Sequence, residues 1–365
     1  LSPDNRLILN VGPLTGTTAP TAGRLGSTTK SPATGTYSDS YCGGYFGQTM
    51  KYAGYDAIIL QGAAPEPVML ILDDERVELR SAADLWGTTI PHANEVLLSQ
   101  YGKGWQTLVI GPPGEKQTNI ASIFNHTRAL ARGGVGAVMG SKNLKAILAR
   151  GTGGVQVADR ARFERALQLA NRAIRMSSGI TRMKQDGTAN ILEFVNAVGA
   201  LPTRNFQQGQ FEAADEITGS SFRYKSWKAD YACFGCPIAC SKVTHEVDGK
   251  LLEGPEYETV FALGSNCAIA DQEAIIRLNL VCDDYGIDTI STGGIVAFVM
   301  EMFEKGLISP GDLDGIQPRF GDCRAALALV EKMARVEGCG EWLSRGVAEI
   351  AKLYPDAAPF AMHVK

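Results

Sequence analysis

The chain has 365 residues, of which 45% are hydrophobic and 20% charged, a composition that excludes a disordered or fibrous protein. Its 35 basic and 39 acidic side chains leave a formal charge of -4 without a run of like charges, so we expect no nucleic-acid partner. The apolar stretches are shorter than the roughly 18 residues of a membrane span, and we expect none. Typical domain sizes of roughly 150 residues predict two or three domains.

The first 154 residues carry the pattern of β-strands. Short β-branched and apolar runs end at Gly or Pro and predict strands over residues 7–11, 56–61, 106–110 and 144–149. Residues 67–72 and 76–80 flank Asp73-Asp74-Glu75, which predicts a hairpin. The Gly-Thr-Gly-Gly stretch within 151–157 is typical of a linker. We therefore expect a β-rich domain at 1–154.

From Ala158 onward the apolar residues recur with the period of a helix. This pattern predicts helices over 161–176, 271–284, 291–305, 324–335 and 340–353, the third with Ser291 as a plausible N-cap. The expected fold class is α+β, with an α-helical domain at 155–365 following the β-rich one.

Three of the eight cysteines fall within eight residues, as Cys233-Phe-Gly-Cys236-Pro-Ile-Ala-Cys240. Such clustering favours a cytoplasmic, metal-binding chain over a secreted disulfide scaffold. The C-x2-C-x3-C spacing lets three thiolates hold one corner of an iron-sulfur cubane, with a fourth ligand from elsewhere. A structural zinc site with His245 as fourth ligand and unligated cysteines are the open alternatives. We expect the five isolated cysteines to be core or surface thiols.

A glycine-rich segment, Arg128-Ala-Leu-Ala-Arg132-Gly-Gly-Val-Gly-Ala-Val-Met-Gly-Ser-Lys142, places cationic side chains beside backbone that could approach an anion. It fits neither a Walker A loop nor the dinucleotide fingerprint. A tight turn with solvated arginines is the alternative. Segments 13–24 and 42–47 are similarly poor in large side chains. Three such loops suggest a large, flat ligand held close to the backbone.

Two groups of carboxylates are candidates for function. Asp283 and Asp288 flank a turn at Gly286, where they could bind the N–H edge of a heterocycle or simply end one helix and cap the next. Glu253-Gly-Pro-Glu256-Tyr-Glu258 follows the cysteine cluster, and one of its carboxylates could serve as general acid or base. A solvated loop is the alternative.

Taken together, these segments resemble the tungsten- and molybdenum-dependent aldehyde ferredoxin oxidoreductase family. The matching stretches run in family order over almost the whole chain: Gly12-Pro-Leu-Thr-Gly16, Thr29-Lys-Ser-Pro32, Gly43-Gly-Tyr-Phe-Gly47, Ala53-Gly-Tyr-Asp-Ala57, the segment from Arg132 to Lys142, the cysteine cluster, Glu253-Gly-Pro-Glu-Tyr-Glu258 and Gly286-Ile-Asp-Thr-Ile-Ser-Thr-Gly-Gly294.

The resemblance implies a first domain of two β-sheets that carries two pterin dithiolene cofactors, whose four sulfurs hold tungsten or molybdenum. It also implies a [4Fe-4S] cluster next to one pterin. Carried over by position, the resemblance implies that Cys233, Cys236 and Cys240 ligate the cluster and that Glu258 transfers protons. The residues that it implies at the pterin phosphates and their bridging Mg²⁺ are Arg24, Tyr41, Gly43, Arg128, Ala129 and Arg132, and those at a pterin ring are Asp283, Ile287 and Asp288.

The chain departs from the family pattern at two places. Tyr41 stands where relatives have an asparagine, a tolerable change if this residue acts through its backbone carbonyl toward magnesium. Arg277 and Leu280 replace a Glu-x-x-His motif that in some members holds a metal between two subunits, so we expect any homodimer to lack that metal. We further expect a fragment that lacks the family's opening strands and a third, C-terminal helical domain with the fourth cluster ligand.

The expected function is oxidation of aldehydes to carboxylic acids, with electrons passing through the cluster to ferredoxin or an iron-sulfur partner subunit. Two rival functions stay open. One is a family member that reduces an aromatic acyl thioester or a carboxylic acid. The other is a non-catalytic iron-sulfur electron carrier, in which the glycine-rich loops are structural turns.

Overall fold

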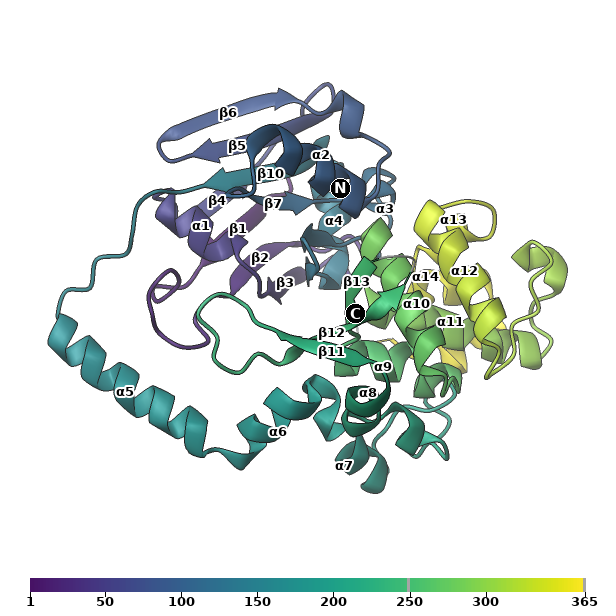
Figure 1. Cartoon of the computed structure of the whole chain (residues 1–365). Helices are drawn as coiled ribbons and strands as arrows, with labels where there is room; N and C mark the ends of the chain where they lie inside the picture. Colours follow the sequence, from purple (N-terminus) through teal and green to yellow (C-terminus); the bar gives the residue numbers. More distant parts are fainter. Residues whose placement is uncertain (248–249, 364–365) are drawn as a thin grey trace. The chain divides into compact units, whose positions relative to one another are not determined.

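The computed structural model describes residues 1–247 and 250–363, without the side chains of residues 245–251. Contacts divide the chain into two compact units (Figure 1). The first unit comprises Leu1–Thr181 and Ala232–Ala239, and the second comprises Arg182–Tyr231 and Cys240–Lys365. Strands in the first unit and helices in the second confirm the α+β fold class. The predicted boundary at 154 lies in the segment between β10 and α5, and it stays a prediction.

The first unit contains two sheets. One is antiparallel with the order β3-β2-β1-β4, and the other has the order β6-β5-β10-β7-β8-β9, in which only β10 and β5 run parallel. The strands are β1 (Leu7–Val11), β2 (Leu25–Lys30), β3 (Tyr37–Cys42), β4 (Ala57–Leu60), β5 (Val68–Asp73), β6 (Arg76–Ser81), β7 (Gln106–Val109), β8 (Ile123–Asn125), β9 (Arg128–Leu130) and β10 (Leu144–Arg150). The hairpin predicted around Asp73-Asp74-Glu75 is the β5–β6 pair.

The first unit also contains helices. They are α1 (Phe46–Tyr52), α2 (Ile90–Tyr101), α3 (Pro112–Glu115), α4 (Val135–Gly140) and α5 (Arg160–Met176), and α6 (Ser178–Asp186) contains the division between the units. One core joins both sheets with α1 and α4, and a second lies between the six-stranded sheet and α2. Leu70 faces the first core and Ile71 the second. Burial on both faces explains why β5 and β10 read as near-continuous apolar runs.

The second unit is built mainly of helices: α7 (Leu192–Ala197), α8 (Gly219–Lys225), α9 (Tyr257–Leu263), α10 (Gln272–Tyr285), α11 (Thr289–Glu304), α12 (Cys323–Arg335), α13 (Gly340–Leu343) and α14 (Val347–Leu353). Besides these helices it has an antiparallel sheet of β11 (Trp227–Tyr231), β12 (Ser241–Val247) and β13 (Lys250–Glu253), which the sequence analysis did not predict. These strands are short and rich in charge, so their apolar alternation is weak.

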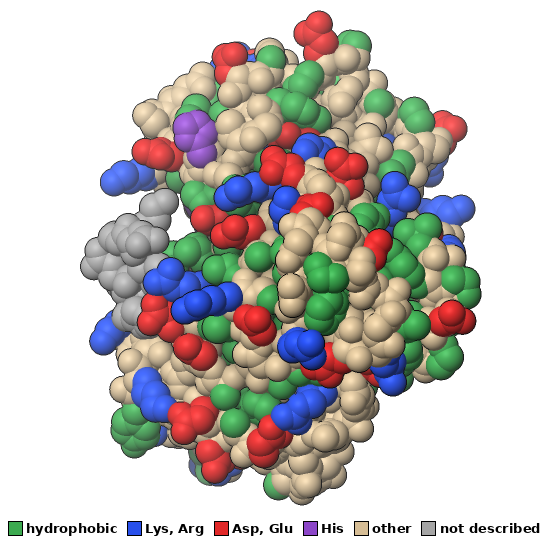
Figure 2. All heavy atoms as spheres, turned by 90° about the vertical axis from the view of Figure 1, so that its right-hand side faces the viewer, with side chains coloured by type: hydrophobic (Ala, Val, Ile, Leu, Met, Phe, Trp, Pro, Cys, Tyr) green, Lys and Arg blue, Asp and Glu red, His purple; other side chains and the backbone are tan. Residues whose placement is uncertain are grey.

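Two helix predictions need correction. The segment 340–353 forms α13 and α14 instead of one helix, because Gly346 takes a φ of 94° between them. The helix predicted from Ser291 begins at Thr289, and its N-cap is Asp288. Among the described residues, no helix is both long and apolar enough to cross a membrane. Basic and acidic side chains are interspersed over the face that Figure 2 shows.

Candidate cofactor site

The loop between β3 and α1 is held by a buried asparagine. The side-chain oxygen of Asn125 on β8 accepts hydrogen bonds from the N–H groups of Tyr45 (2.9 Å) and Phe46 (3.2 Å). Its amide donates to the carbonyl oxygen of Thr107 at 2.9 Å. Gly44 in this loop has a φ of 93°, a conformation that favours glycine. Sequence reasoning missed Asn125, because a lone asparagine in a strand carries no spacing signal.

The cysteine-containing segment 232–239 lies against this loop in the first unit. The N–H of Phe234 donates to the carbonyl oxygen of Gly44 at 3.2 Å. Its ring stands edge-on to Tyr45 and Tyr52, with centroids 6.4 and 6.3 Å apart. The hydroxyl of Tyr45 donates to the carbonyl oxygen of Ala232 at 3.0 Å. The fold therefore brings a predicted cluster segment to a predicted pterin loop.

Cys233 and Gly43 are in close contact. A Cβ placed on Gly43 would collide with the Cys233 sulfur, so Gly43 leaves room for this thiol in its present position. The neighbouring Cys42 is fully buried, and burial raises the pKa of its thiol from 9.0 to about 12. Arg24 and Arg128 both act against this rise in the Cys42 pKa, so their positive charges lie near the same point. Four predicted site residues thus lie around the end of β3: Arg24, Gly43, Arg128 and Cys233.

The three clustered cysteines form no disulfide bond and are half-buried. The N–H of Cys236 donates to the carbonyl oxygen of Cys233 at 3.1 Å across a turn in which Gly235 has a φ of 62°. Cys233 and Cys236 belong to the first unit, and Cys240 belongs to the second. Within the described part of the chain, no three His, Cys, Asp or Glu side chains converge as metal ligands. The side chain of His245, the alternative zinc ligand, lies outside the described residues.

The other cysteines match the expectation for isolated thiols. Cys42, Cys267, Cys282 and Cys339 are buried, and Cys323 is half-buried.

The first part of the glycine-rich segment lies beside the loop between β3 and α1, which Asn125 holds. Arg128 and Ala129 are on β9, opposite Asn125 and Phe124 of β8, and both are half-buried. Arg132 begins a short 3-10 helix over Arg132–Gly134, and its N–H donates to the Ser40 hydroxyl on β3 at 3.3 Å. These contacts place Arg128, Ala129 and Arg132 near β3.

The second part of that segment has structural roles. A Cβ on Gly136 would lie 2.6 Å from the carbonyl oxygen of Ser122, so glycine is required by close backbone packing. The ammonium of Lys142 is buried and donates to the carbonyl oxygens of Pro3, Asn5 and Gly62 at 3.3, 2.6 and 3.1 Å. Lys142 therefore holds the N-terminal turn, and residues 136–140 belong to helix α4.

Tyr41 lies on β3 with its side chain 57% exposed, whereas Ser40 and Cys42 on either side of it are buried. Because side chains alternate along a strand, the Tyr41 ring points to the face opposite the Cys42 thiol. A hydrogen bond with Asp39 raises the pKa of the Tyr41 hydroxyl. On the face of the strand that carries the Cys42 thiol, Tyr41 can therefore take part only through its backbone.

Asp283, Ile287 and Asp288 lie together at the turn between α10 and α11 in the second unit. Gly286 ends α10 with a φ of 80°. The Asp288 carboxylate is 2% exposed and accepts from the N–H groups of Ile290 and Ser291, both at 3.2 Å. Asp283 accepts a 2.9 Å hydrogen bond from the Asn279 amide. Asp288 thus caps α11, the alternative that the sequence left open.

Glu258 lies in the first turn of α9 with an exposed side chain. The hydroxyls of Thr259 and Thr289 form a 2.8 Å hydrogen bond, which joins α9 to the start of α11. Gly293 on α11 has no Cβ where the backbone of Ala262 on α9 passes, so the two helices approach closely. Thr259 and Thr289 directly follow Glu258 and Asp288, so the fold brings these two predicted site residues to neighbouring positions.

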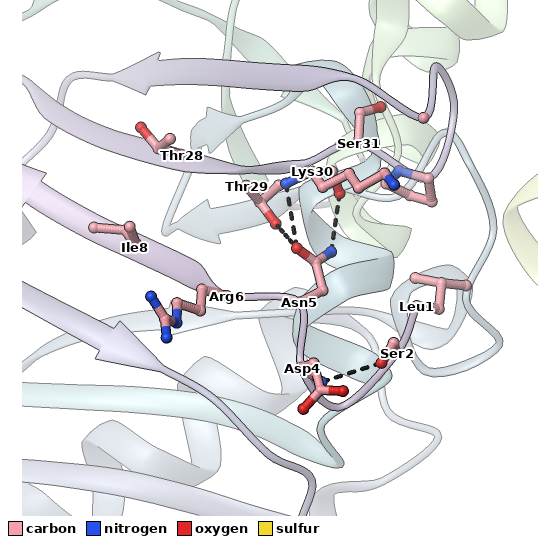
Figure 3. A pocket seen from close by; sticks show the side chains of 12 residues that line it. Leu1, Ser2, Asp4, Asn5, Arg6, Ile8, Thr28, Thr29, Lys30 and Ser31 are labelled. Atoms are coloured by element: carbon pink, nitrogen blue, oxygen red, sulfur yellow. Dashed lines mark hydrogen bonds between the residues drawn. The ribbon is translucent and has the colours of Figure 1, made fainter.

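A hollow of about 740 Å³ lies elsewhere in the first unit, beside the N-terminal turn and the start of β1 (Figure 3). Its polar groups bond mainly to one another: the Asn5 side chain donates to the Lys30 carbonyl oxygen at 2.9 Å and accepts from the Thr29 hydroxyl at 3.2 Å. None of the predicted site residues lines it.

Both halves of the chain match sequence models of one family. Residues 1–151 match the aldehyde ferredoxin oxidoreductase N-terminal domain, and residues 165–365 match domains 2 and 3 of the same enzyme. Tungsten-containing aldehyde ferredoxin oxidoreductases from Pyrococcus abyssi and Thermococcus kodakarensis are 42% and 40% identical to the chain over its full length. The chain spans 61% of each of these two relatives.

More distantly similar proteins are named for reactions other than aldehyde oxidation. The aliphatic sulfonate oxidoreductase, WOR-like subunit, of Pyrococcus furiosus is 30% identical over the full chain and 62% of its own length. Among solved structures, the active-site complex BamBC of benzoyl coenzyme A reductase, in complex with 1,5-dienoyl-CoA, superimposes with a TM-score of 0.86. It is 26% identical, and the match covers 99% of this chain and 57% of that one.

Proposed function

Because the chain belongs to the aldehyde ferredoxin oxidoreductase family, we propose that its protein oxidises aldehydes to carboxylic acids at a tungsten or molybdenum bis-pterin centre. Electrons would leave through a [4Fe-4S] cluster to ferredoxin or an iron-sulfur partner subunit. The observation that carries the proposal is the contact of segment 232–239 with the loop after β3. It puts the thiol of Cys233 beside Gly43 and near Arg24 and Arg128.

The residues present fit such a cofactor pair. Gly43 leaves space that a side chain would fill, and guanidinium groups near it suit phosphate groups. Cysteine thiols outside disulfide bonds are the donors that iron-sulfur clusters take, and these three are half-buried. In the proposal, Arg24, Arg128 and Arg132 would bind pterin phosphates, Gly43 and Ala129 would approach them through backbone, and Tyr41 would act on Mg²⁺ through its carbonyl oxygen. The C-x2-C-x3-C spacing supports Cys233, Cys236 and Cys240 as cluster ligands.

The mechanism assigns separate tasks to the second unit. When bound, the bis-pterin metal centre supplies two-electron redox chemistry and the cluster passes electrons singly. The carboxylate of Glu258 takes the proton released as water adds to the aldehyde carbonyl, and its exposed position at the start of α9 suits proton exchange with solvent. Asp283, Ile287 and Asp288 would hold a pterin ring at the turn that joins α10 to α11, where Asp288 also caps α11.

A homodimer without a bridging metal accompanies this proposal. On α10, Arg277 donates to Glu273 one turn earlier at 2.8 Å, and Leu280 has no metal-binding atom. Where some family members bind a metal between two subunits, Arg277 instead forms an ion pair with Glu273 of the same helix.

A reductase acting on an aromatic acyl thioester is the second candidate, which the resemblance to BamBC favours. Assays with benzaldehyde and with benzoyl-CoA, each with a redox dye, separate the two directions. Turnover of benzoyl-CoA alone would replace aldehyde oxidation as the function.

Metal analysis of full-length protein purified without oxygen tests the proposal. About one tungsten or molybdenum and about four irons per chain support it. Iron without either heavy metal identifies an electron carrier, and stoichiometric zinc contradicts both. Glu258→Gln should abolish aldehyde oxidation while metal content stays at the wild-type level, and retained activity would remove the role of Glu258.

A further inference from the structure

The carboxylate of Glu256 bonds to two segments that are remote from it in sequence. Glu256 occupies the N-cap position of α9, but its side chain does not cap that helix. Instead, one oxygen accepts from the Thr188 hydroxyl at 2.5 Å and the other from the Ser241 hydroxyl at 2.8 Å. Both contacts lie within the second unit.

The side chain of Thr188, and not that of Glu256, caps the N-terminus of α9. Its hydroxyl oxygen accepts from the N–H of Tyr257, the first residue of α9, at 2.8 Å. The same hydroxyl donates to Glu256, so its single proton and a lone pair are both used. Thr188, Glu256 and Ser241 thus form one chain of hydrogen bonds that ends at the start of β12.

That end of the chain is next to Cys240. Ser241 is the first residue of β12 and is 1% exposed. The backbone of Gly187 packs beside that of Cys240, because a Cβ added to this glycine would lie 3.1 Å from the Cys240 carbonyl oxygen. Lys242, also buried, donates to the Asp230 carboxylate at 2.6 Å. The backbone that leaves Cys240 is therefore tightly held.

The other end of the chain is next to Glu258, which follows Glu256 by two residues in the first turn of α9. We propose that Glu256 is a positioning residue that fixes Cys240 relative to the helix start carrying Glu258. The inference rests on the proposed function, in which Cys240 ligates the cluster and Glu258 moves the proton. Partners that orient a metal ligand without touching the metal commonly control affinity and activity.

The test compares variants of the full-length protein purified without oxygen. Glu256→Ala removes both hydrogen bonds, Ser241→Ala removes the one toward Cys240, and Glu256→Gln keeps an acceptor oxygen. Glu273→Ala, which removes an exposed carboxylate from the first turn of α10, is the matched control. The readouts are the electron paramagnetic resonance spectrum and midpoint potential of the reduced cluster, iron content, and kcat and KM for an aldehyde.

We expect Glu256→Ala to lower kcat by about 10- to 100-fold with a smaller change in KM, and to alter the cluster spectrum and potential. Ser241→Ala should alter the spectrum in the same direction, Glu256→Gln should recover part of the loss, and Glu273→Ala should match wild type. If Glu256→Ala does not fold, the spectrum of Ser241→Ala tests the proposal instead. This variant removes only one side-chain oxygen, so the fold should tolerate it.

Wild-type spectra and kcat in both alanine variants would overturn the assignment of Glu256. Wild-type protein that contains no iron would overturn the proposed function and this inference together. Iron-loaded wild-type protein with unaffected variants would overturn this inference alone.

Discussion

The N–H of Phe234 donates a 3.2 Å hydrogen bond to the carbonyl oxygen of Gly44, and this contact joins two loops that are far apart in sequence. One loop carries Cys233 and Cys236, and the other carries Cys42 and Gly43. A pterin held by the second loop and a cluster held by the first would be neighbours, which is the condition for rapid electron transfer between them.

Gly43→Ala should disturb the cysteine loop. The added methyl group would collide with the Cys233 sulfur, and overpacking of this kind typically costs about 1–3 kcal/mol. We expect lower stability in urea unfolding and less iron per chain. Gly104→Ala is the control, since no atom lies within 4 Å of its new Cβ. Equal iron content in both variants would contradict the assigned contact.

Asn125→Ala should destabilise the first unit. The substitution removes the acceptor for the N–H groups of Tyr45 and Phe46 at a buried position, and we expect a loss of about 2 kcal/mol in the free energy of unfolding. Asn10→Ala, on the exposed side of β1, should change it by less than about 0.5 kcal/mol. Similar losses of unfolding free energy for the two variants in urea would argue against the role of Asn125 in holding the loop.

Lys145 and Glu115 form a buried ion pair of 2.5 Å in the first unit. Burial raises the pKa of Glu115 and lowers that of Lys145, and the attraction between them opposes both shifts. Lys145→Met leaves the carboxylate without its cation, so we expect a loss of about 3–5 kcal/mol at neutral pH.

The loss in Lys145→Met should depend on pH. A carboxyl whose pKa is raised in the folded state stabilises the fold while protonated, and this contribution disappears as pH rises through the folded pKa. The variant should therefore be less impaired at about pH 5 than at about pH 8. Adding Glu115→Gln should recover stability at the higher pH, and a pH-independent loss would contradict the explanation.

Cys339 predicts a second pH effect. Burial, aided by Asp314, raises the pKa of this thiol from 9.0 to about 11. Between these values the unfolded chain loses the proton and the folded chain keeps it, so stability falls as pH rises through this window. Cys339→Ala should reduce the slope of unfolding free energy against pH there. An unchanged slope in Cys339→Ala would refute the raised pKa of this thiol.

Local patterns predicted many elements of the fold. The strand at 7–11, the hairpin around Asp74 and the helices at 160–176 and 323–335 follow from apolar periodicity and turn residues. Strands β2, β3, β8, β9 and β11 were missed, because β2 and β3 are rich in polar residues and the other three are too short to show periodicity. The capping role of Asp288 was an alternative that spacing alone left undecided against ligand binding.

By itself, the sequence determined the family, the α+β class and the residue types available for chemistry, because ordered motifs and periodicity are written along the chain. Only the tertiary structure decided that Cys233 contacts Gly43, that Lys142 is buried among carbonyl oxygens and that Glu256 bonds to Thr188 and Ser241. Such contacts join segments far apart in sequence. They depend on how strands pair and where helices cross, and these are properties of the packed core rather than of local spacing.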